Sequence, residues 1–200
     1  MKLLLATHNE HKRREFARLL PDGDGAATWH LQALPEAVEL PPEDGETFAD
    51  NALGKARAAA TGTGRPSIAD DSGIESAALG GAPGVRSARY AGEDASDQEN
   101  LDKLLAEAPA GSALEYVCAI AYVDPARGVE RVFEGRCAGS LAEQPRGARG
   151  FGYDPAFLPQ DGPQGLTMAQ LSDEQKDAIS HRGRAARALF AWLSDAGPEA

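Results

Sequence analysis

Two adjacent acidic residues, Asp70 and Asp71, follow a short apolar stretch that begins at Ser67, and the dipeptide Ser72-Gly73 comes next. Ligands of α/β proteins gather at the carboxyl ends of buried strands. Two carboxylates there repel each other unless a cation or a shared proton lies between them. One of them can hold Mg²⁺, while the same group or its neighbour takes a proton from an attacking water. A simple Asx-type turn is the alternative interpretation.

A second candidate site is the run Thr7-His8-Asn9-Glu10-His11-Lys12, where a predicted strand gives way to a predicted helix. Backbone N–H groups and the helix dipole attract anions to a helix N-terminus, and the lysine would add a charge beside a phosphate. The run is not a Walker A loop, because it lacks the G-x-x-x-x-G-K pattern. Ordinary helix capping by Thr7 or Asn9 is the alternative interpretation.

A third candidate site is an acidic loop that leads into a predicted helix. The loop carries Glu43, and the helix carries Asn51 and Lys55, which are four residues apart and therefore share one helix face. A carboxylate suits an oxygen-liganded Mg²⁺, and an ammonium group suits a phosphate oxygen. Solvated surface charge is the alternative interpretation.

Two more groups lie in the last quarter of the chain. Residues 150–155 read Gly-Phe-Gly-Tyr-Asp-Pro, in which glycines permit close approach of a ligand and aromatic rings offer a stacking surface. A packed turn is the alternative. Lys176 and the run Ser180-His181-Arg182 fall at the end of a predicted helix, where cations can also simply complement the helix dipole. The histidines and the two cysteines lack the spacing of a zinc site.

The elements that must position these residues follow from hydrophobic spacing and turn residues. Helices are predicted at 10–20, 47–60, 96–108, 172–180 and 184–193, and strands at 2–6, 67–70, 114–124 and 129–138. Gly62 and Gly64 are expected to stop the second helix, and Ser72-Gly73 to form a turn after the second strand. Helices and strands alternate early and a hairpin follows, which predicts an α/β fold with a mixed sheet.

Composition narrows the class of protein. The chain has 200 residues, 42% of them hydrophobic, and a net charge of −11, which suits one domain that repels nucleic acid. No apolar run approaches the ~18 residues that a membrane span needs, and the first residues lead into a strand, not a signal peptide. Two cysteines suit a reducing compartment. We therefore expect a cytoplasmic protein that binds neither nucleic acid nor membrane.

Taken together and in this order, the motifs are specific enough to indicate a protein family. The chain resembles the Ham1/RdgB family of inosine/xanthosine triphosphate pyrophosphatases, and the resemblance covers nearly its whole length. The matching blocks are Leu5-Ala6-Thr7-x-Asn9-x-x-Lys12-x-x-Glu15, Thr47-Phe48-x-x-Asn51-Ala52-x-x-Lys55-Ala56, Ala69-Asp70-Asp71-Ser72-Gly73, Gly80-Gly81-Ala82-Pro83-Gly84-Val85, Ser87-Ala88-Arg89-Tyr90-Ala91-Gly92, Gly150-Phe151-Gly152-Tyr153-Asp154-Pro155 and Ile179-Ser180-His181-Arg182.

The resemblance implies a two-lobed α/β fold of the Maf/Ham1 type, with a long central mixed sheet flanked by helices. Residues 1–200 would form a single such domain, with one active-site cleft between its lobes. Members of the family usually form homodimers. They hydrolyse non-standard purine nucleoside triphosphates (ITP, dITP, XTP and dXTP) to the monophosphate and pyrophosphate with Mg²⁺, which cleanses the nucleotide pool.

The resemblance also implies roles for individual residues. Asp71 is the expected general base and a metal ligand, and Glu43 is the expected second metal ligand. The residues expected to hold the phosphates are Thr7, His8, Asn9, Glu10, His11, Lys12 and Lys55. Those expected around the rest of the substrate are Ser72, Phe151, Gly152, Tyr153, Asp154, Lys176, His181 and Arg182.

The chain departs from the family pattern at three positions. Pro42 stands about where the family has its metal-binding glutamate, so Glu43 is the substitute; Arg86 replaces an aromatic residue, and Gln170 replaces a common acid. Two other functions remain as alternatives. A nucleotide-binding module without turnover is disfavoured by the paired aspartates, because a pure anion binder gains nothing from added negative charge. A Maf-like pyrophosphatase of other base specificity is disfavoured by the Ser180-His181-Arg182 block.

Overall fold

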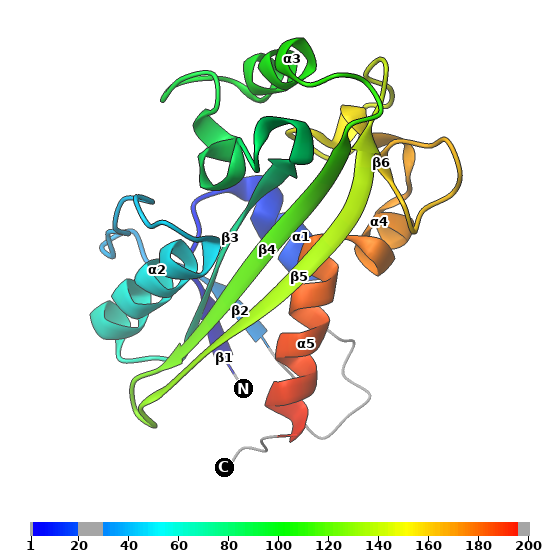
Figure 1. Cartoon of the computed structure of the whole chain (residues 1–200). Coiled ribbons are helices and arrows are strands. Elements are labelled where there is room, and N and C mark those ends of the chain that lie inside the picture. Colours follow the sequence, from blue (N-terminus) through cyan, green and yellow to red (C-terminus); the bar gives the residue numbers. More distant parts are fainter. Residues whose placement is uncertain (1, 20–29, 196–200) are drawn as a thin grey trace. The chain divides into compact units, whose positions relative to one another are not determined.

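A mixed sheet of six strands runs through the computed structural model, which describes residues 2–19 and 30–195 (Figure 1). The strands are β1 Lys2–Leu5, β2 His30–Ala33, β3 Ser67–Ser76, β4 Ala113–Asp124, β5 Val129–Leu141 and β6 Phe157–Pro159. They lie in the order β2-β1-β3-β4-β5-β6. β1 pairs in parallel with β2 and β3, whereas β5 pairs antiparallel with β6. The predicted α/β class with a mixed sheet is confirmed.

The helices of the described residues are α1 Glu10–Leu19, α2 Phe48–Thr63, α3 Asp97–Glu107, α4 Asp173–Ile179 and α5 His181–Asp195. A capping box opens α2, α3 and α4. In α2, for example, Thr47 accepts from the backbone N–H of Asp50, and the Asp50 carboxylate accepts from the backbone N–H of Thr47. Each box satisfies N–H groups that the first turn of a helix leaves unpaired, which explains where these helices begin.

The chain folds as two compact units, each with its own apolar core. The first unit comprises Met1–Asp71, Cys118–Gly135 and Arg184–Ala200, so far as these ranges are described. The second comprises Ser72–Val117 and Arg136–Gly183. The long strands β3, β4 and β5 contribute residues to both units, and Asp71 and Ser72 are consecutive residues of β3.

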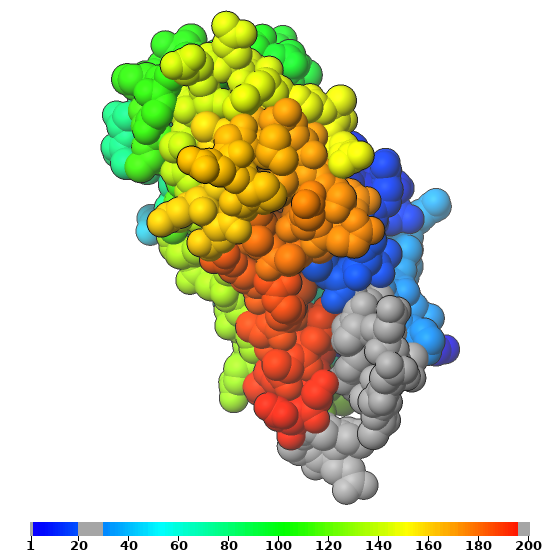
Figure 2. Space-filling view, turned by 90° about the vertical axis from the view of Figure 1, so that its right-hand side faces the viewer, coloured from blue at the N-terminus to red at the C-terminus, as the bar shows by residue number. Residues whose placement is uncertain are grey.

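The core of the first unit joins strands β1, β3 and β4 to helices α1 and α5. Leu3 and Leu5 of β1 pack with Phe16 of α1 and with Leu189 of α5 in one cluster. Leu4 faces the other side of the sheet, because side chains alternate along a strand, and it too is fully buried. Helix α5 buries one side only, and its outer side is seen in red in Figure 2.

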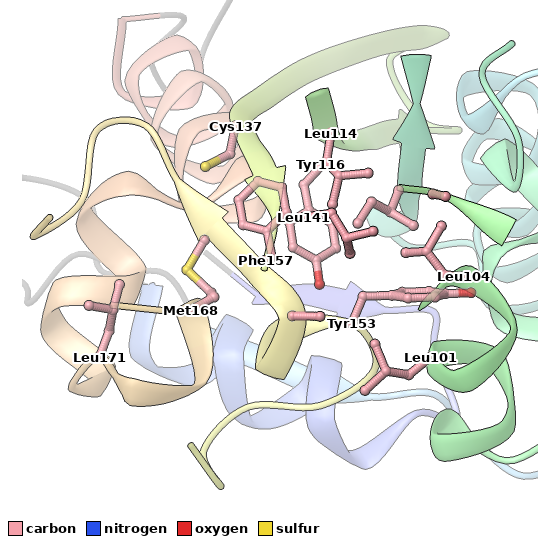
Figure 3. Packing of buried hydrophobic residues seen from close by; sticks show 13 residues of the cluster. Leu101, Leu104, Leu114, Tyr116, Cys137, Leu141, Tyr153, Phe157, Met168 and Leu171 are labelled. Atoms are coloured by element: carbon pink, nitrogen blue, oxygen red, sulfur yellow. The ribbon is translucent and has the colours of Figure 1, made fainter. Parts of the chain in front are cut away.

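The core of the second unit is built around the rings of Tyr116 and Phe157, whose centroids are 4.5 Å apart (Figure 3). Leu101 and Leu104 of α3 and the short strand β6 close around them. Tyr153 belongs to the same cluster and is 6% exposed. The segment 150–155, which carries candidate binding residues, is therefore anchored in this core through an aromatic side chain.

The loop between β2 and α2 lies along helix α2. A Cβ atom at Gly62 would lie 3.4 Å from Val38, and one at Gly54 would lie 3.7 Å from Pro41. The glycines of α2 thus allow the loop to approach the helix closely. Gly62 was predicted to end this helix, but it lies inside α2, and the helix ends at Gly64.

Several predicted boundaries differ from the structure. No turn forms at Ser72-Gly73, because β3 continues through these residues to Ser76. The Ser180-His181-Arg182 run follows the end of α4 at Ile179, as predicted, but His181 begins α5, whereas the last helix was predicted to begin at residue 184. The short strands β2 and β6 were not predicted, and the predicted end of the first helix, residue 20, lies outside the described residues. Between residues 2 and 195, apart from 20–29, no helix has the length and apolar content that a membrane crossing requires.

Candidate active site

Two lysine ammonium groups converge on Asp70 at the end of the first unit's part of β3. The Nζ of Lys12 lies 3.2 Å from Oδ2 of Asp70, and the Nζ of Lys55 donates to the Asp70 carbonyl oxygen at 2.7 Å. The Asp70 side chain is fully buried. A buried carboxylate needs a paired cation to remain charged. The ion pair of Lys12 and the hydrogen bond of Lys55 thus fix both lysine heads beside the next residue, Asp71.

Asp71 is a buried carboxylate with a defined neutral partner. It is 5% exposed, and Oδ2 accepts a hydrogen bond of 2.8 Å from Nδ2 of Asn51. Burial raises the pKa of Asp71 above its ordinary value, although the charges of Lys55 and Lys12 pull the pKa down. A carboxylate made more basic than usual in a polar, enclosed setting is suited to accept a proton.

Lys55 is surrounded by negative charge. Burial lowers its pKa, but the carboxylates of Asp70, Glu43 and Asp71 outweigh burial, so the pKa is raised above 10.5. Its ammonium forms an ion pair with Glu43 from the acidic loop. Lys55 therefore keeps its charge at neutral pH and is a fixed positive group next to Asp71.

The run from Thr7 to Lys12 forms the turn between β1 and α1. Asn9 is its cap: the side-chain Oδ1 accepts from the backbone N–H groups of His11 at 2.9 Å and of Lys12 at 3.1 Å. Thr7 supports the turn by accepting from the backbone N–H of Asn9 at 3.2 Å. The capping interpretation is confirmed, and anion binding by this turn stays a prediction.

In the second unit, the Asp154 carboxylate joins three groups. Oδ2 accepts from Nζ of Lys176 at 2.6 Å and from the backbone N–H of Phe151 at 3.0 Å. Oδ1 accepts from the hydroxyl of Tyr116 at 3.1 Å. Asp154 is 3% exposed, so its carboxylate holds Lys176 and the loop in place from within the core. Gly150 must be a glycine, because φ is +73° and a Cβ would lie 2.0 Å from that carboxylate.

The ring of Phe151 lies near two cations. Nζ of Lys176 is 5.2 Å and Cζ of Arg182 is 5.9 Å from its centroid, which is within cation–π range. The next residue of the loop, Gly152, donates its backbone N–H to Asp97 at 2.9 Å. The loop thus presents a partly exposed aromatic ring with positive charge around it.

His181 and Arg182 sit at the first turn of α5. The His181 ring stacks on Tyr116 at 4.6 Å with an interplanar angle of 7°. Arg182 is 1% exposed and donates to the hydroxyl oxygen of Ser72 at 2.7 Å. Both side chains are therefore held by side chains of the second unit.

The comparisons with known proteins decide the family. The model of the Ham1 family matches residues 3–192. The chain belongs to the Ham1 family. It is 47% identical to the dITP/XTP pyrophosphatase of Corynebacterium efficiens, with 98% of both chains covered, and 48% identical to that of Yersinia pseudotuberculosis, with 98% of this chain and 99% of the relative covered. The chain is also 38% identical to a solved HAM1 protein from Coxiella burnetii. The match covers 98% of this chain and 99% of that protein, and the two superpose with a TM-score of 0.85.

Most residues expected from the Ham1 resemblance gather in two groups. In the first unit, Lys12, Glu43, Lys55 and Asp71 interact directly or through Asp70. In the second unit the group consists of Ser72, Phe151, Gly152, Tyr153, Asp154, Lys176, His181 and Arg182. His8, Glu10 and His11 are exposed, and the carboxylate of Glu10 pairs with Arg13 at 2.9 Å.

Two residues that contact the first group, Asp70 and Asn51, were not among the expected site residues. Asp70 was seen only as half of an acidic pair, although it is the anchor for Lys12 and Lys55. Asn51 was seen only as a neighbour of Lys55, although it contacts Asp71. The i, i+4 spacing of Asn51 and Lys55 was the available signal, since both residues had to face the same way.

A divalent metal in this region would need oxygen ligands. Within residues 2–19 and 30–195, no three His, Cys, Asp or Glu side chains form a group that could hold a metal ion by themselves. Asp71 and Glu43 are nonetheless near enough that the charge of Glu43 raises the pKa of Asp71. Mg²⁺ is commonly bound by one or two carboxylates together with substrate phosphates. Two carboxylates beside a fixed lysine fit that mode of binding.

Proposed function

We propose that this chain hydrolyses non-standard purine nucleoside triphosphates, namely ITP, dITP, XTP and dXTP, to the monophosphate and pyrophosphate. The observation that carries the proposal is Asp71, a buried carboxylate of raised pKa beside two fixed lysines. The names of the relatives, dITP/XTP pyrophosphatase, support the same substrates. The reaction would cleanse the nucleotide pool.

The chemistry needs an aligned water and neutralised charge more than it needs a covalent intermediate. The water oxygen forms a bond to the α-phosphorus, and the bond from that phosphorus to the bridging oxygen of pyrophosphate breaks. Asp71 accepts the proton that the water loses. Lys12 and Lys55 offer positive charge to the phosphate oxygens, as does the turn that begins at Thr7.

A divalent metal is part of the proposal, and we propose Mg²⁺. Asp71 and Glu43 would hold it together with phosphate oxygens of the substrate. When bound, the ion would neutralise part of the triphosphate charge. Glu43 reaches this position from the acidic loop, where Pro42 takes the place expected for the family's glutamate.

The base and sugar are assigned to the second group of residues. Phe151 offers a partly exposed ring on which a purine can stack, and Lys176 and Arg182 bring donors near that ring. Asp154 keeps Lys176 in place. We also propose a cytoplasmic homodimer, which light scattering on the purified protein and fractionation of cells would test.

One turnover panel tests the function. Purified protein with Mg²⁺ is given ITP, dITP, XTP, dXTP, GTP, ATP and the pyrimidine triphosphates, and both pyrophosphate and monophosphate are measured. The proposal requires equimolar pyrophosphate and monophosphate from the inosine and xanthosine substrates. Binding of these nucleotides without turnover would instead indicate a nucleotide-binding module, and preferential turnover of another base would indicate a Maf-like specificity.

A further inference from the structure

The side-chain amide of Asn51 joins the general base to the acidic loop. Its Nδ2 donates to Oδ2 of Asp71 at 2.8 Å, and its Oδ1 accepts from the backbone N–H of Gly45 at 2.8 Å. We propose that Asn51 is a positioning residue that fixes, through one amide, both the Asp71 carboxylate and the loop that carries Glu43. The inference rests on the proposed function, because it concerns the base of that reaction.

The amide has only one favourable orientation. If it were turned over, its NH₂ group would face the N–H of Gly45 and its oxygen would face the Asp71 carboxylate. Two attractive contacts would then become two repulsive ones, in a place where Asn51 is 5% exposed and water offers little compensation. The donor to Asp71 is therefore held in a fixed direction.

The backbone of Asn51 is held as firmly as its side chain. Asn51 lies in the first turn of α2, directly after the residue that completes the Thr47 capping box. Lys55 follows one turn later and bonds to the carbonyl of Asp70. The helix thus places the Asn51 amide and the Lys55 ammonium against two consecutive residues of β3.

A neutral donor suits a general base better than a third cation would. Its hydrogen bond limits rotation of the Asp71 carboxylate about the Cβ–Cγ bond and adds no charge that would compete for the phosphates. A general base has to lie within hydrogen-bond reach of the proton that it takes, and a misplacement of about 1 Å can slow a reaction by about 100-fold. Orientation is therefore the property that the loss of Asn51 would remove.

A substitution at Gly45 would disturb the other end of the Asn51 amide, its Oδ1 atom. A Cβ atom there would lie 2.7 Å from Oδ1 of Asn51 and 2.8 Å from Cβ of Asp50, so a methyl group must push one of them aside. Glu43 lies two residues earlier in this loop and pairs with Lys55. Gly45→Ala should therefore disturb Asp71 from a distance, through Asn51.

The test compares Asn51→Ala, Gly45→Ala and the double variant with the wild type. For Asn51→Ala we expect kcat for dITP to fall about 100-fold, while KM and the dissociation constant of the monophosphate change less than about threefold. Gly45→Ala should lower kcat to a smaller degree. The double variant should be no slower than Asn51→Ala, because both changes act through one amide.

Arg57→Ala is the matched control, since Arg57 lies on the same helix and pairs at the surface with Glu130 at 2.6 Å. Its kcat should equal that of the wild type. Backbone amide exchange at Gly45, followed by NMR, should speed up in Asn51→Ala while the amides of β4 keep their protection. This readout does not depend on turnover, and Gly45→Ala decides the matter if Asn51→Ala does not fold.

The inference is wrong if Asn51→Ala keeps kcat within threefold of the wild type, if the two losses multiply in the double variant, or if the Gly45 amide keeps its exchange rate. A wild type that releases no pyrophosphate from dITP or XTP would instead contradict the proposed function. The two failures are therefore told apart by the wild-type and Arg57→Ala rates in the same assay.

Discussion

The ammonium Nζ of Lys176 donates to Oδ2 of Asp154 at 2.6 Å, and the two side chains are only 8% and 4% exposed. In the second unit, Arg136 and Glu115 form a pair of the same length, 2.6 Å, with side chains 49% and 36% exposed. The two pairs differ strongly in burial, and Arg136 also pairs with Glu75 at 3.6 Å. They therefore offer a direct comparison of what a buried and an exposed ion pair contribute.

We predict that Lys176→Met or Asp154→Asn alone lowers the free energy of unfolding by about 3–5 kcal/mol, because each leaves an uncompensated buried charge. The double variant should lose much less than the sum of the two. Arg136→Met should lose less than about 1 kcal/mol. Urea unfolding of the four variants measures these changes, and equal losses for Lys176→Met and Arg136→Met would contradict the account.

Asp71→Asn should abolish turnover of dITP and leave substrate binding largely intact. The new side chain keeps its size and an oxygen that can accept from Asn51, but it cannot take a proton and it contributes no charge to a metal. A loss of several powers of ten in kcat is expected. Single-turnover kinetics and calorimetry with dITP measure the two effects.

Asp102→Asn is the control for the loss of one negative charge, because Asp102 is an exposed residue of α3 that accepts a hydrogen bond from Gln98. It should turn over dITP at the wild-type rate. If Asp71→Asn also stays within threefold of the wild type, Asp71 is not the general base.

Lys12→Ala and Lys55→Ala should weaken binding of the triphosphate much more than binding of the monophosphate. The physical reason is that the lysines are expected to hold the outer phosphates, which the product lacks. Both lysines also compensate Asp70, so thermal unfolding must be measured alongside calorimetry. An equal loss of affinity for the two nucleotides would mean that these lysines do not hold the outer phosphates.

The fold could be predicted where the signals are local. The capping residues Ser96 and Glu99 mark the start of α3 in the sequence, and the structure contains their reciprocal hydrogen bonds. The path of β3 through Ser72-Gly73 could not be predicted, because pairing in the sheet overrides a local turn signal. Strands β2 and β6 have four and three residues, which is too short for alternation to show.

The sequence predicts which types of residue form the candidate site, but not which of these residues contact each other. The contact between Lys12 and Asp70 joins residues 58 positions apart, and no spacing rule reaches that far. The same holds for Asp97 and Gly152, which are 55 positions apart. Their meeting depends on how the helices pack, so chemistry-bearing residues were found while their partners were not.

Glu43→Gln should raise the Mg²⁺ concentration needed for half-maximal rate, if Glu43 has taken over the role expected at Pro42. A neutral amide is a poorer ligand for Mg²⁺ than a carboxylate, and the change also removes the partner of Lys55. Glu46→Gln, an exposed change in the same loop, is the control. Titration of Mg²⁺ at fixed dITP makes the measurement. An unchanged requirement would leave Asp71 and the substrate phosphates as the main ligands.

Purine bases differ in the hydrogen-bonding groups that they carry at positions 6 and 1. Hypoxanthine and xanthine carry a 6-oxo acceptor beside an N1–H donor, whereas adenine carries a 6-amino donor and no proton on N1. Arg182 is 1% exposed, so a hydrogen bond from its guanidinium would be made almost out of reach of water, where a mismatch is least compensated. Donors from Arg182, and from backbone near Phe151, would bond a 6-oxo group and leave an amino group unpaired.

Guanine shares the 6-oxo group, so its rejection must come from the 2-amino substituent, which is a donor that meets other donors or lacks room. We therefore predict that ITP and XTP are used far more efficiently than GTP, and that ATP is used least. A mispaired buried polar group costs about 1–3 kcal/mol and adenine has two mismatches, so the ratio of kcat/KM for ITP over ATP should be at least about 100.

Arg182→Ala should reduce that ratio more than it weakens ITP binding through the phosphates. Arg182→Lys should keep only part of the ratio, because a lysine cannot present two parallel donors. The measurement is kcat/KM for the four nucleotides in each variant, with thermal unfolding to account for the lost contact to Ser72. Wild-type protein that hydrolyses ATP as efficiently as ITP would contradict the donor argument and the proposed substrate class together.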